Sequence, residues 1–333
     1  MQYRTLGRTG LSVSALGIGA WQLSGPLLVD GKADGFPDIG RDKAIDLIRA
    51  CADLGINFVD TAPIYGDGEG ERRVGLATRA DRERWVLCTK FGLSRGHNGE
   101  KIKDAAPSKI RSSLAESLKR LQTDYVDVYL YHSPPDGRQI PEGKEVLESL
   151  KQEGKIRFYG ISTNDQKALG RLASQRSVDV AMFSQSLVTH SPKILNLIEE
   201  NALGGIVRGA FEAGRLSGRY FHEQPQFSSQ DIRKQAIDSS ETKKYAVYEK
   251  LLPDKTLMPA FALRYLLDFD TTHTIVLGGK SLDHYKAALE AFRLPALTTQ
   301  ERKALRETRH KLLKKPLRTL AADLVRRAAS RLL

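Results

Sequence analysis

The chain has 333 residues, 41% of them hydrophobic and 28% charged, which is enough for one large α/β barrel or two medium domains with an ordinary core. The formal net charge is +12, but residues 302–333 hold 11 basic and 2 acidic side chains. The body before them carries only about +3, which argues against a nucleic-acid-binding surface over the whole molecule.

No hydrophobic signal region follows Met1, and no apolar run is long enough to span a membrane. We therefore expect a cytoplasmic protein that binds no nucleic acid. The two cysteines, Cys51 and Cys88, lie in apolar stretches, and this favours reduced core thiols over a disulfide or a metal site.

The chain opens with a predicted β-hairpin. Residues 3–16 contain two short strand-like runs around Gly7-Arg8-Thr9-Gly10, whose glycines permit a tight turn. The run from Ala15 to Gly19 predicts a buried strand whose glycines allow close approach to the backbone. The composition of residues 21–40 predicts a polar, glycine-rich loop.

From residue 41 onward, helical segments alternate with short apolar strands. The helices have apolar residues at helical spacing, and several begin with proline or end at glycine. They are predicted at 41–54, 71–80, 107–121, 141–153, 165–173, 192–201, 255–267 and 282–291. The strands between them are predicted at 58–60, 85–90, 126–132, 156–162, 178–183, 205–207 and 274–278. The irregular stretch 211–239 is typical of a functional loop or of disorder.

Counted from Ala15, eight strands alternate with helices, a pattern that favours a parallel sheet covered by helices. We predict an α/β fold, a (β/α)8 TIM barrel with an N-terminal β-hairpin and extra C-terminal helices. A doubly wound open sheet would need a Gly-x-Gly-x-x-Gly turn after its first strand, but Gly17 and Gly19 lie inside a strand. The predicted domains are a barrel over residues 1–300 and a basic amphipathic helical extension over 301–333.

Four side chains stand at or just after the ends of three successive predicted strands. Asp60, Lys90 and His132 end the second, third and fourth strands, and Tyr65 follows the second. In a barrel these strand ends share one mouth, with neighbouring strands roughly 4.8 Å apart. We expect Lys90 to lower the pKa of the Tyr65 phenol from about 10, and Asp60 to hold the lysine in place. With His132 donating to a carbonyl oxygen, the set is suited to carbonyl reduction by a hydride from elsewhere.

These motifs resemble those of the aldo-keto reductase family. The glycine-punctuated hairpin is matched by residues 6–14, the Asp-Thr-Ala-x-x-Tyr-Gly signature by 60–66, the Thr-Lys strand end by 89–90, the histidine strand by 124–132 and the strand-five segment by 160–162. The resemblance runs from about Tyr3 to Ala291. It implies a (β/α)8 barrel that uses NAD(P)H, with Tyr65 as proton donor, Lys90 and Asp60 tuning it, and His132 orienting the substrate carbonyl.

The resemblance also implies cofactor-binding positions, some of which depart from the family pattern. The family's asparagine after Ser162 is displaced to Asn164, and its glutamine and stacking tyrosine on strand six correspond to Met182 and Gln185. Gln185 cannot stack as an aromatic ring does. The predicted cofactor set is Gly19, Ala20, Trp21, Ser162, Thr163, Asn164, Gln185, Arg215, Leu216, Ser217, Gly218, Gly278, Lys280, Ser281 and His284.

The 2′-phosphate of NADPH is expected at Lys280 and Ser281, which offer a charge and a hydroxyl. The family's late adenine-binding residues fall near Ala287 and Ala288, so His284 or Lys286 is the alternative partner of the phosphate.

Three interpretations of function stay open on the sequence. The favoured one is an NADPH-dependent oxidoreductase that reduces a small aldehyde or ketone, including a sugar-like carbonyl. The second is an NADP-binding barrel that runs redox-neutral chemistry on a sugar-like substrate. The third is a non-enzymatic sensor or scaffold, which would have no need of the complete proton-transfer set.

Two predictions concern the surroundings of the barrel. After Pro316, apolar residues recur at helical spacing with arginines between them, which is typical of a helix packed on its own barrel or lying on an anionic membrane. We favour packing over membrane contact. Trp21 and Phe91, next to strand ends one and three, are expected as walls of the substrate pocket.

Overall fold

The computed structural model describes residues 1–252, 254 and 257–313. The helix predicted after Pro316 lies outside the described residues, as do positions 255 and 256 of the predicted helix 255–267. No helix within the described part is long and apolar enough to cross a membrane.

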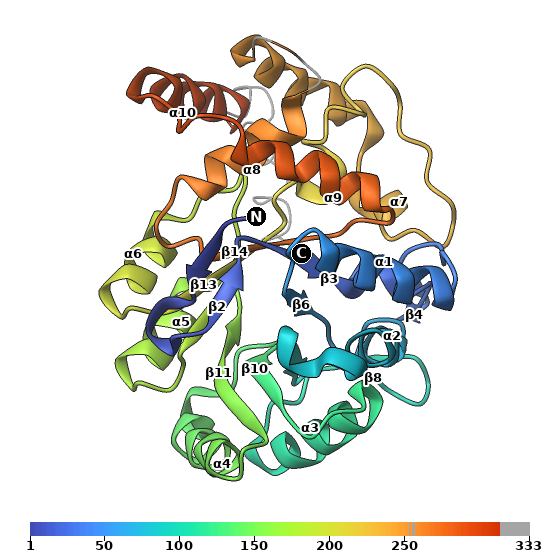
Figure 1. Ribbon diagram of the computed structural model, residues 1–333, viewed down its shortest axis with the longest axis vertical. Helices are drawn as coiled ribbons and strands as arrows, with labels where there is room; N and C mark the ends of the chain where they lie inside the picture. Colours follow the sequence, from blue (N-terminus) through green and yellow to red (C-terminus); the bar gives the residue numbers. More distant parts are fainter. Residues whose placement is uncertain (253, 255–256, 314–333) are drawn as a thin grey trace, which may run out of the picture.

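Within the described residues, eight parallel strands form a closed barrel surrounded by helices (Figure 1). The barrel strands are β3 (Leu16–Gly19), β6 (Phe58–Asp60), β7 (Val86–Phe91), β10 (Val126–Tyr131), β11 (Ile156–Ser162), β12 (Val180–Ser184), β13 (Gly204–Arg208) and β14 (Thr274–Leu277). Each pairs with the next along the chain, and β14 pairs with β3 to close the ring. The predicted (β/α)8 fold is confirmed.

The helices follow the strands in the predicted order, except that the four-residue helix Arg233–Ala236 lies within the stretch 211–239 that was predicted to be irregular. They are α1 (Arg41–Asp53), α2 (Glu69–Thr78), α3 (Pro107–Leu121), α4 (Ile140–Gln152), α5 (Gln166–Ser174), α6 (Pro192–Glu200), α7 (Arg233–Ala236), α8 (Met258–Leu267), α9 (Leu282–Leu289) and α10 (Thr299–Leu313). Proline stands in the first turn of α3, α4, α6 and α8, where a missing N–H costs nothing. Asp165 caps α5 by accepting from the backbone N–H groups of Lys167 and Ala168.

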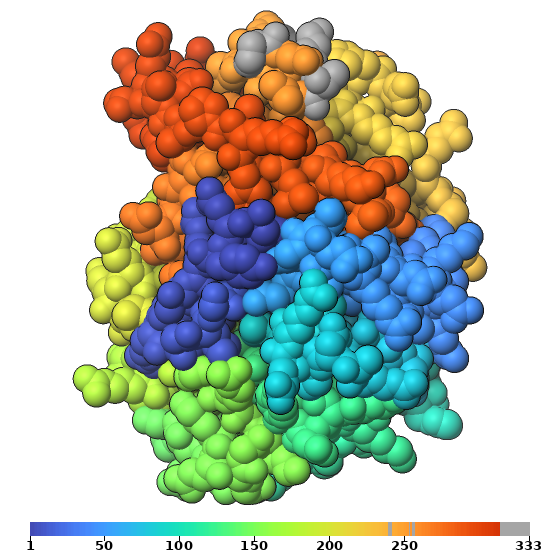
Figure 2. Space-filling model, in the orientation of Figure 1, coloured from blue at the N-terminus to red at the C-terminus, as the bar shows by residue number. Residues whose placement is uncertain are grey.

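An N-terminal hairpin closes the amino-terminal end of the barrel. β1 (Tyr3–Thr5) and β2 (Ser12–Ser14) pair antiparallel, as predicted, and Leu6 between them is buried against the barrel's interior side chains. Gly7, with φ +51°, lies so close to β13 that a Cβ would come 2.4 Å from the backbone of Gly204, so only glycine fits there. The hairpin is part of the dark blue segment on the face seen in Figure 2. The accessible mouth is therefore the opposite end, where the strands finish.

Two small hairpins follow the carboxyl ends of β3 and β7. β4 (Leu28–Val29) pairs with β5 (Lys32–Ala33), and β8 (Ser94–Arg95) pairs with β9 (Lys101–Ile102). The prediction of a polar, glycine-rich loop over residues 21–40 is therefore wrong in part, because it contains the β4–β5 hairpin. Its Asp30-Gly31 pair has positive φ at both residues, which is the two-residue hairpin turn that Asp-Gly favours.

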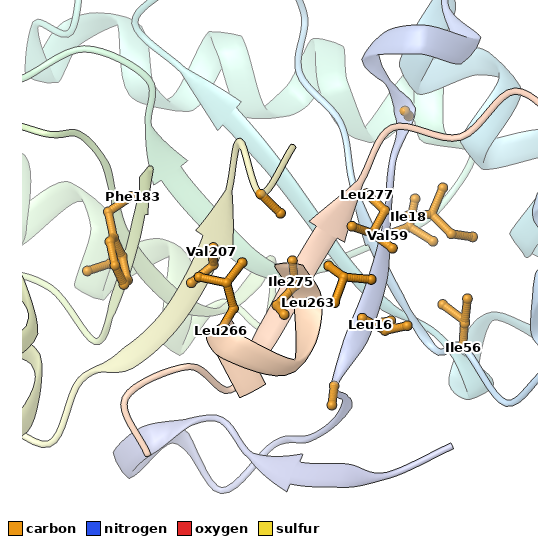
Figure 3. Close-up of a cluster of buried hydrophobic side chains, with 14 of the residues drawn as sticks. Leu16, Ile18, Ile56, Val59, Phe183, Val207, Leu263, Leu266, Ile275 and Leu277 are labelled. Atoms are coloured by element: carbon orange, nitrogen blue, oxygen red, sulfur yellow. The ribbon is translucent and has the colours of Figure 1, made fainter. Parts of the chain in front are cut away.

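Side-chain alternation along the strands divides the core into two clusters. One cluster packs between the barrel and its helices, as Figure 3 shows for Val207 and Ile275 near Leu263 and Leu266 of α8. The other fills the barrel interior, and its members include Phe58, Cys88, Leu130, Met182 and Ile206. Cys51 and Cys88 are buried and unpaired, as expected. This two-residue period decides which strand-end residues face the mouth.

Helix α10 packs on the body of the protein and spans the predicted boundary between residues 300 and 301. Its Leu305 is buried, and Arg302 forms an ion pair with Asp268 at 2.7 Å. Arg309 donates to the hydroxyl of Tyr265 on α8 at 2.9 Å. Residues 301–313 are thus held to the barrel by both apolar and charged contacts.

Candidate active site

One layer of side chains lines the mouth, and strand alternation determines its members. Phe58, Cys88, Leu130, Met182 and Ile206 face the apolar interior of the barrel, so residues two positions later face the same interior one layer higher. These residues are Asp60, Lys90, His132, Ser184 and Arg208.

Lys90 is the centre of a buried ion pair in this layer. Its Nζ donates to Oδ1 of Asp60 at 2.5 Å, to the carbonyl of Thr61 at 2.8 Å and to the phenolic oxygen of Tyr65 at 3.2 Å. Lys90 and Asp60 are buried, whereas Tyr65 is partly exposed. The three contacts match the three donors of an ammonium, so the lysine is fixed against both the carboxylate and the phenol. The predicted convergence of these residues is observed.

Burial is the largest influence on the pKa values of this group. It raises the pKa of the Tyr65 phenol, which Lys90 lowers and Asp60 raises again. The expectation that Lys90 brings this pKa below its usual value is therefore wrong, because desolvation of the phenolate outweighs the attraction of the ammonium. Burial alone would lower the pKa of Lys90, but Asp60 and Tyr65 more than reverse this effect. Lys90 therefore stays charged.

His132 stands beside the phenol of Tyr65. The two rings meet edge-on with their centroids 5.9 Å apart. Burial, followed by the charges of Lys90, Arg208 and Lys101, lowers the pKa of His132 well below its usual range, so the imidazole is neutral at pH 7. Its Nδ1 is buried without a hydrogen-bond partner among the described residues. A neutral imidazole retains one N–H that can donate to a substrate oxygen.

Aromatic rings cover one side of this group. The Trp21 ring stacks on Tyr65 with centroids 5.8 Å apart, and Phe36 packs edge-on to Trp21 at 5.2 Å. Trp21 thus lies against Tyr65, where a wall of the substrate pocket is predicted, and Phe36 packs on Trp21. Phe91 is not a wall residue, because it points to the opposite side of β7 from Lys90 and packs on Tyr129 and Tyr131.

Arg208 is a mouth residue that the sequence analysis did not identify. Its guanidinium donates to Oγ of Ser184 at 2.6 Å and to Oδ1 of Asn164 at 3.4 Å. Asn164 also accepts from the backbone N–H of Ser184 at 2.8 Å and donates to its Oγ at 3.1 Å. Side-chain alternation along the strand indicates its position, because a buried Ile206 places residue 208 on the interior side of the barrel. An isolated arginine after an apolar run is equally typical of a solvated strand end.

The predicted nicotinamide-side residues occupy the ends of β11 and β12. Ser162 and Thr163 are buried there, and Asn164 is bonded to Ser184. Met182 lies in the apolar interior, so it offers no polar group at the mouth. Gln185 is fully buried, and neither polar atom of its amide has a hydrogen-bond partner among the described residues. A nicotinamide carboxamide would supply the donor and acceptor that such an amide lacks, but the Gln185 side chain is enclosed here, so its assignment to the cofactor stays a prediction.

The predicted positions next to β3 and β14 lie close together. A Cβ on Gly19 would come 3.3 Å from the carbonyl of Leu277, and a Cβ on Gly278 would overlap the side-chain amide of Gln22. Ala20 and Trp21 begin a short 3-10 helix after β3. The glycines at 19 and 278 therefore allow these two segments to pack closely.

Lys280 reaches across to the loop before α1. Its Nζ donates to the carbonyl of Pro37 at 2.9 Å and lies 5.4 Å from the ring centre of Phe36. Its backbone N–H donates to Nδ1 of the exposed His284 at 3.2 Å. Ser281 precedes the first residue of α9. Lys280, Ser281 and His284 thus gather at the start of one helix, which is a place that favours an anion.

The four predicted residues after β13 form a compact turn. The guanidinium of Arg215 donates to the carbonyls of Glu212 and Ala236. Leu216 is buried, the hydroxyl of Ser217 donates to the carbonyl of Gly214 at 2.7 Å, and Gly218 has φ +82°.

Two surface grooves of about 400 and 520 Å³ lie along α3 and share no residue with this turn or with the mouth.

Comparison with known proteins gives one consistent family. The Aldo/keto reductase family model matches residues 15–310. The uncharacterized oxidoreductase YqkF of Bacillus subtilis (strain 168) is 29% identical over 308 residues, which cover 92% of this chain and 95% of the relative. The NADH-specific methylglyoxal reductase of Escherichia coli (strain K12) is 32% identical over 228 residues, covering 64% of this chain and 68% of the relative.

The solved structures agree with this result. The holo form of aldo-keto reductase AKR11C1 from Bacillus halodurans matches with a TM-score of 0.77 and 30% sequence identity. The match covers 92% of this chain and 96% of that one. The similarity therefore includes the barrel and most of the helices described above.

Proposed function

Because the chain belongs to the aldo/keto reductase family, we propose that it reduces an aldehyde or ketone with hydride from NADPH and a proton from Tyr65. The observation that carries this proposal is the 3.2 Å contact between Lys90 and the Tyr65 phenol, beside His132. The family match and the oxidoreductase relatives support carbonyl reduction in general. The preference for NADPH and the sugar-like substrate belong to the proposal.

The residues of this chain handle the proton. A carbonyl oxygen would bind between Tyr65 and His132, and the hydride for the carbonyl carbon would come from bound NADPH. Tyr65 gives its phenolic proton to the oxygen as negative charge develops there, and Lys90 stabilises the resulting phenolate. The raised pKa of Tyr65, caused first by burial, suits a donor because the phenol stays protonated at neutral pH.

Asp60 and His132 have supporting roles. Asp60 holds the Lys90 ammonium at 2.5 Å and keeps it charged. His132 is neutral, so it donates one hydrogen bond to the carbonyl oxygen without competing with Tyr65 to deliver a proton. The carbonyl is thereby polarised by one donor and protonated by another.

Other residues of the chain would hold the cofactor. Gln185 and Ser162 would meet the carboxamide of the nicotinamide, and the turn 215–218 would lie along the pyrophosphate. Lys280, Ser281 and His284 would bind the 2′-phosphate at the start of α9. Lys280 would exchange its contact with the Pro37 carbonyl for the phosphate, which is the stronger acceptor.

A paired measurement tests the proposal and separates it from the other interpretations. NADPH binding is followed by its fluorescence, and a panel of aldehydes, ketones and nucleotide-linked keto-sugars is screened by the loss of cofactor absorbance. We expect saturable binding and reduction of at least one carbonyl class. No binding up to roughly 100 µM, within the usual range of KM values, would favour a sensor or scaffold. Binding without any reduction would favour redox-neutral chemistry.

A further inference from the structure

Among the described residues, Arg208 brings a positive charge into the mouth and bonds to no carboxylate. The other two cations that influence His132 are already paired, Lys90 with Asp60 at 2.5 Å and Lys101 with Asp34 at 2.9 Å. In the part of the chain that the structure describes, the guanidinium of Arg208 bonds to the neutral groups of Ser184 and Asn164. The mouth is therefore electropositive by one uncompensated charge.

The positive charge of the Arg208 guanidinium destabilises the folded protein at this position. Arg208 is partly buried, and burial lowers its pKa, although Tyr65 and Asp60 oppose that effect. A guanidinium does not deprotonate in proteins, so it cannot relieve the cost by becoming neutral. A buried charge without a counter-ion is destabilising. A ligand that brings a negative charge would remove this cost.

The guanidinium is also held in a fixed orientation. Ser184 and Asn164 bond to each other as well as to Arg208, so the three side chains form a small network across the ends of β12 and β13. The two bonds from Arg208 use two of its five N–H donors. A planar fork with spare donors is suited to bind both oxygens of a carboxylate or phosphate.

Arg208 lies close to the reacting groups. It occupies the same interior layer as Asp60, Lys90 and His132, because it follows the interior residue Ile206 by two positions. Burial dominates the pKa values of Tyr65 and His132, and Arg208 is among the charges that lower both. A ligand bound to Arg208 would therefore share the mouth with a carbonyl placed between Tyr65 and His132.

We propose that Arg208 is a substrate-binding residue that selects carbonyl compounds carrying a carboxylate or a phosphate. The inference rests on the proposed function, because it concerns the substrate of the same mouth. The competing occupant is the carboxamide of the nicotinamide, which could accept from Arg208. A carboxamide is neutral and would leave the charge unbalanced, so the geometry and charge together favour an anionic substrate.

The test compares matched anionic and neutral substrates. We would measure kcat/KM with saturating NADPH for 2-oxo acids against their methyl esters, and for phosphorylated keto-sugars against the unphosphorylated sugars. The wild type should prefer the anionic member of at least one pair, and that pair identifies the anion as carboxylate or phosphate. Arg208→Gln should lower this preference at least about tenfold, mainly through KM, as expected for loss of a charge-assisted contact. Arg208→Lys should restore part of it.

Two controls make the outcome specific. Lys101→Gln removes a charge that Asp34 already balances, so it should change the preference by less than about threefold if a specific contact is at work. NADPH dissociation constants and thermal unfolding midpoints of all variants show whether the cofactor site and the fold are intact. If Arg208→Gln does not fold, Arg208→Lys and the wild-type preference carry the test.

Failure of the inference about Arg208 can be distinguished from failure of the proposed function. If Arg208→Gln weakens NADPH binding and lowers kcat/KM equally for anionic and neutral substrates, Arg208 serves the cofactor and the inference is overturned. If the wild type reduces neutral carbonyls as well as anionic ones, the inference fails and the proposed function stands. A wild type that binds NADPH but reduces no carbonyl would overturn the proposed function itself.

Discussion

The ammonium of Lys90 lies 3.2 Å from the phenolic oxygen of Tyr65. The two residues come from successive strand segments, because β6 and β7 pair in parallel with Asp60 opposite Cys88. Lys90 is two positions beyond Cys88, on the same face of its strand, and the loop after Asp60 brings Tyr65 back over it. A contact between a charged amine and a phenol is thus a product of barrel register, and the proposed proton transfer depends on it.

Replacing Tyr65 with phenylalanine removes the proposed proton donor and little else. We expect kcat/KM for carbonyl reduction to fall by about 10²–10⁴-fold, the usual contribution of a general acid. The NADPH dissociation constant should change by less than about threefold, because no cofactor contact is assigned to the hydroxyl. Tyr3→Phe makes the same chemical change at an exposed hairpin residue and should leave kcat/KM unaltered. Full activity in Tyr65→Phe would remove the proton-donor assignment.

Replacing Lys90 with methionine should change the pH dependence of the reaction. Burial is the main cause of the raised pKa of Tyr65, and Lys90 lowers it, so loss of the ammonium raises it further. The alkaline limb of kcat/KM, which reports deprotonation of the phenol, should move to higher pH while the rate at pH 7 falls. Because Asp60 would be left buried and unpaired, the double variant Asp60→Asn/Lys90→Met is the folding control. Superimposable pH profiles would contradict the coupling.

The sequence was sufficient for the barrel because its strands are short, apolar and regularly separated by amphipathic helices. The β4–β5 hairpin was overlooked because its strands are only two residues long, too short for a periodic pattern. Its Asp30-Gly31 turn was the readable signal. The convergence of Asp60, Tyr65 and Lys90 was predictable because strand ends in a barrel share one mouth.

Other features of the site depend on distances that a sequence does not contain. The net pKa shift of Tyr65 is a difference between burial and charge, and only the three-dimensional surroundings decide its sign. Phe91 was placed in the pocket by its position next to a strand end, but alternation from Lys90 turns it toward the helices. For Arg208 the opposite holds. Its place after an apolar run suggests a solvated strand end, but alternation along β13 directs its side chain to the barrel interior.

Replacing Lys280 with methionine should weaken the binding of NADPH and not of NADH. Lys280 stands at the start of α9 with Ser281, where a phosphate is favoured. We expect the NADPH dissociation constant to rise about tenfold, consistent with loss of one charge-assisted contact, and the NADH constant to change little. The wild type should bind NADPH more tightly than NADH. If Lys286→Met produces this loss instead, the phosphate lies further along α9, and equal constants for both cofactors in the wild type would contradict the preference.

Two glycine substitutions should differ sharply in stability although both are sterically crowded. A Cβ at Gly160 would come 1.9 Å from the backbone carbonyl of Val180 on the neighbouring strand, which cannot move without breaking the β11–β12 pairing. Gly160→Ala should lower the free energy of unfolding by about 3 kcal/mol or more. The three atoms nearest to a Cβ at Gly278 all belong to the side-chain amide of Gln22, which can rotate away. Gly278→Ala should cost less than about 1 kcal/mol, and similar losses in urea unfolding would contradict this argument.

Acidification should destabilise the protein partly through His190. Its Nδ1 is buried without a partner among the described residues, and burial, followed by the charge of Arg309 on α10, lowers its pKa to about 4. The unfolded chain binds the proton first, at about pH 6.5, so stability is lost as pH falls from about 6.5 toward 4. Between pH 7 and pH 5 this amounts to at most roughly 2 kcal/mol, less for the part of the ring in contact with water.

His190→Gln should therefore lose roughly 1–2 kcal/mol less than the wild type between these two pH values, measured by urea unfolding at each. Arg309→Met should reduce the loss in the same direction, because it removes the cation that lowers the histidine's pKa. The effect of Arg309→Met should be smaller than that of His190→Gln, because burial is the larger cause of the lowered pKa of His190 and this variant retains it. Equal losses in His190→Gln and the wild type would mean that groups other than His190 govern the acid response.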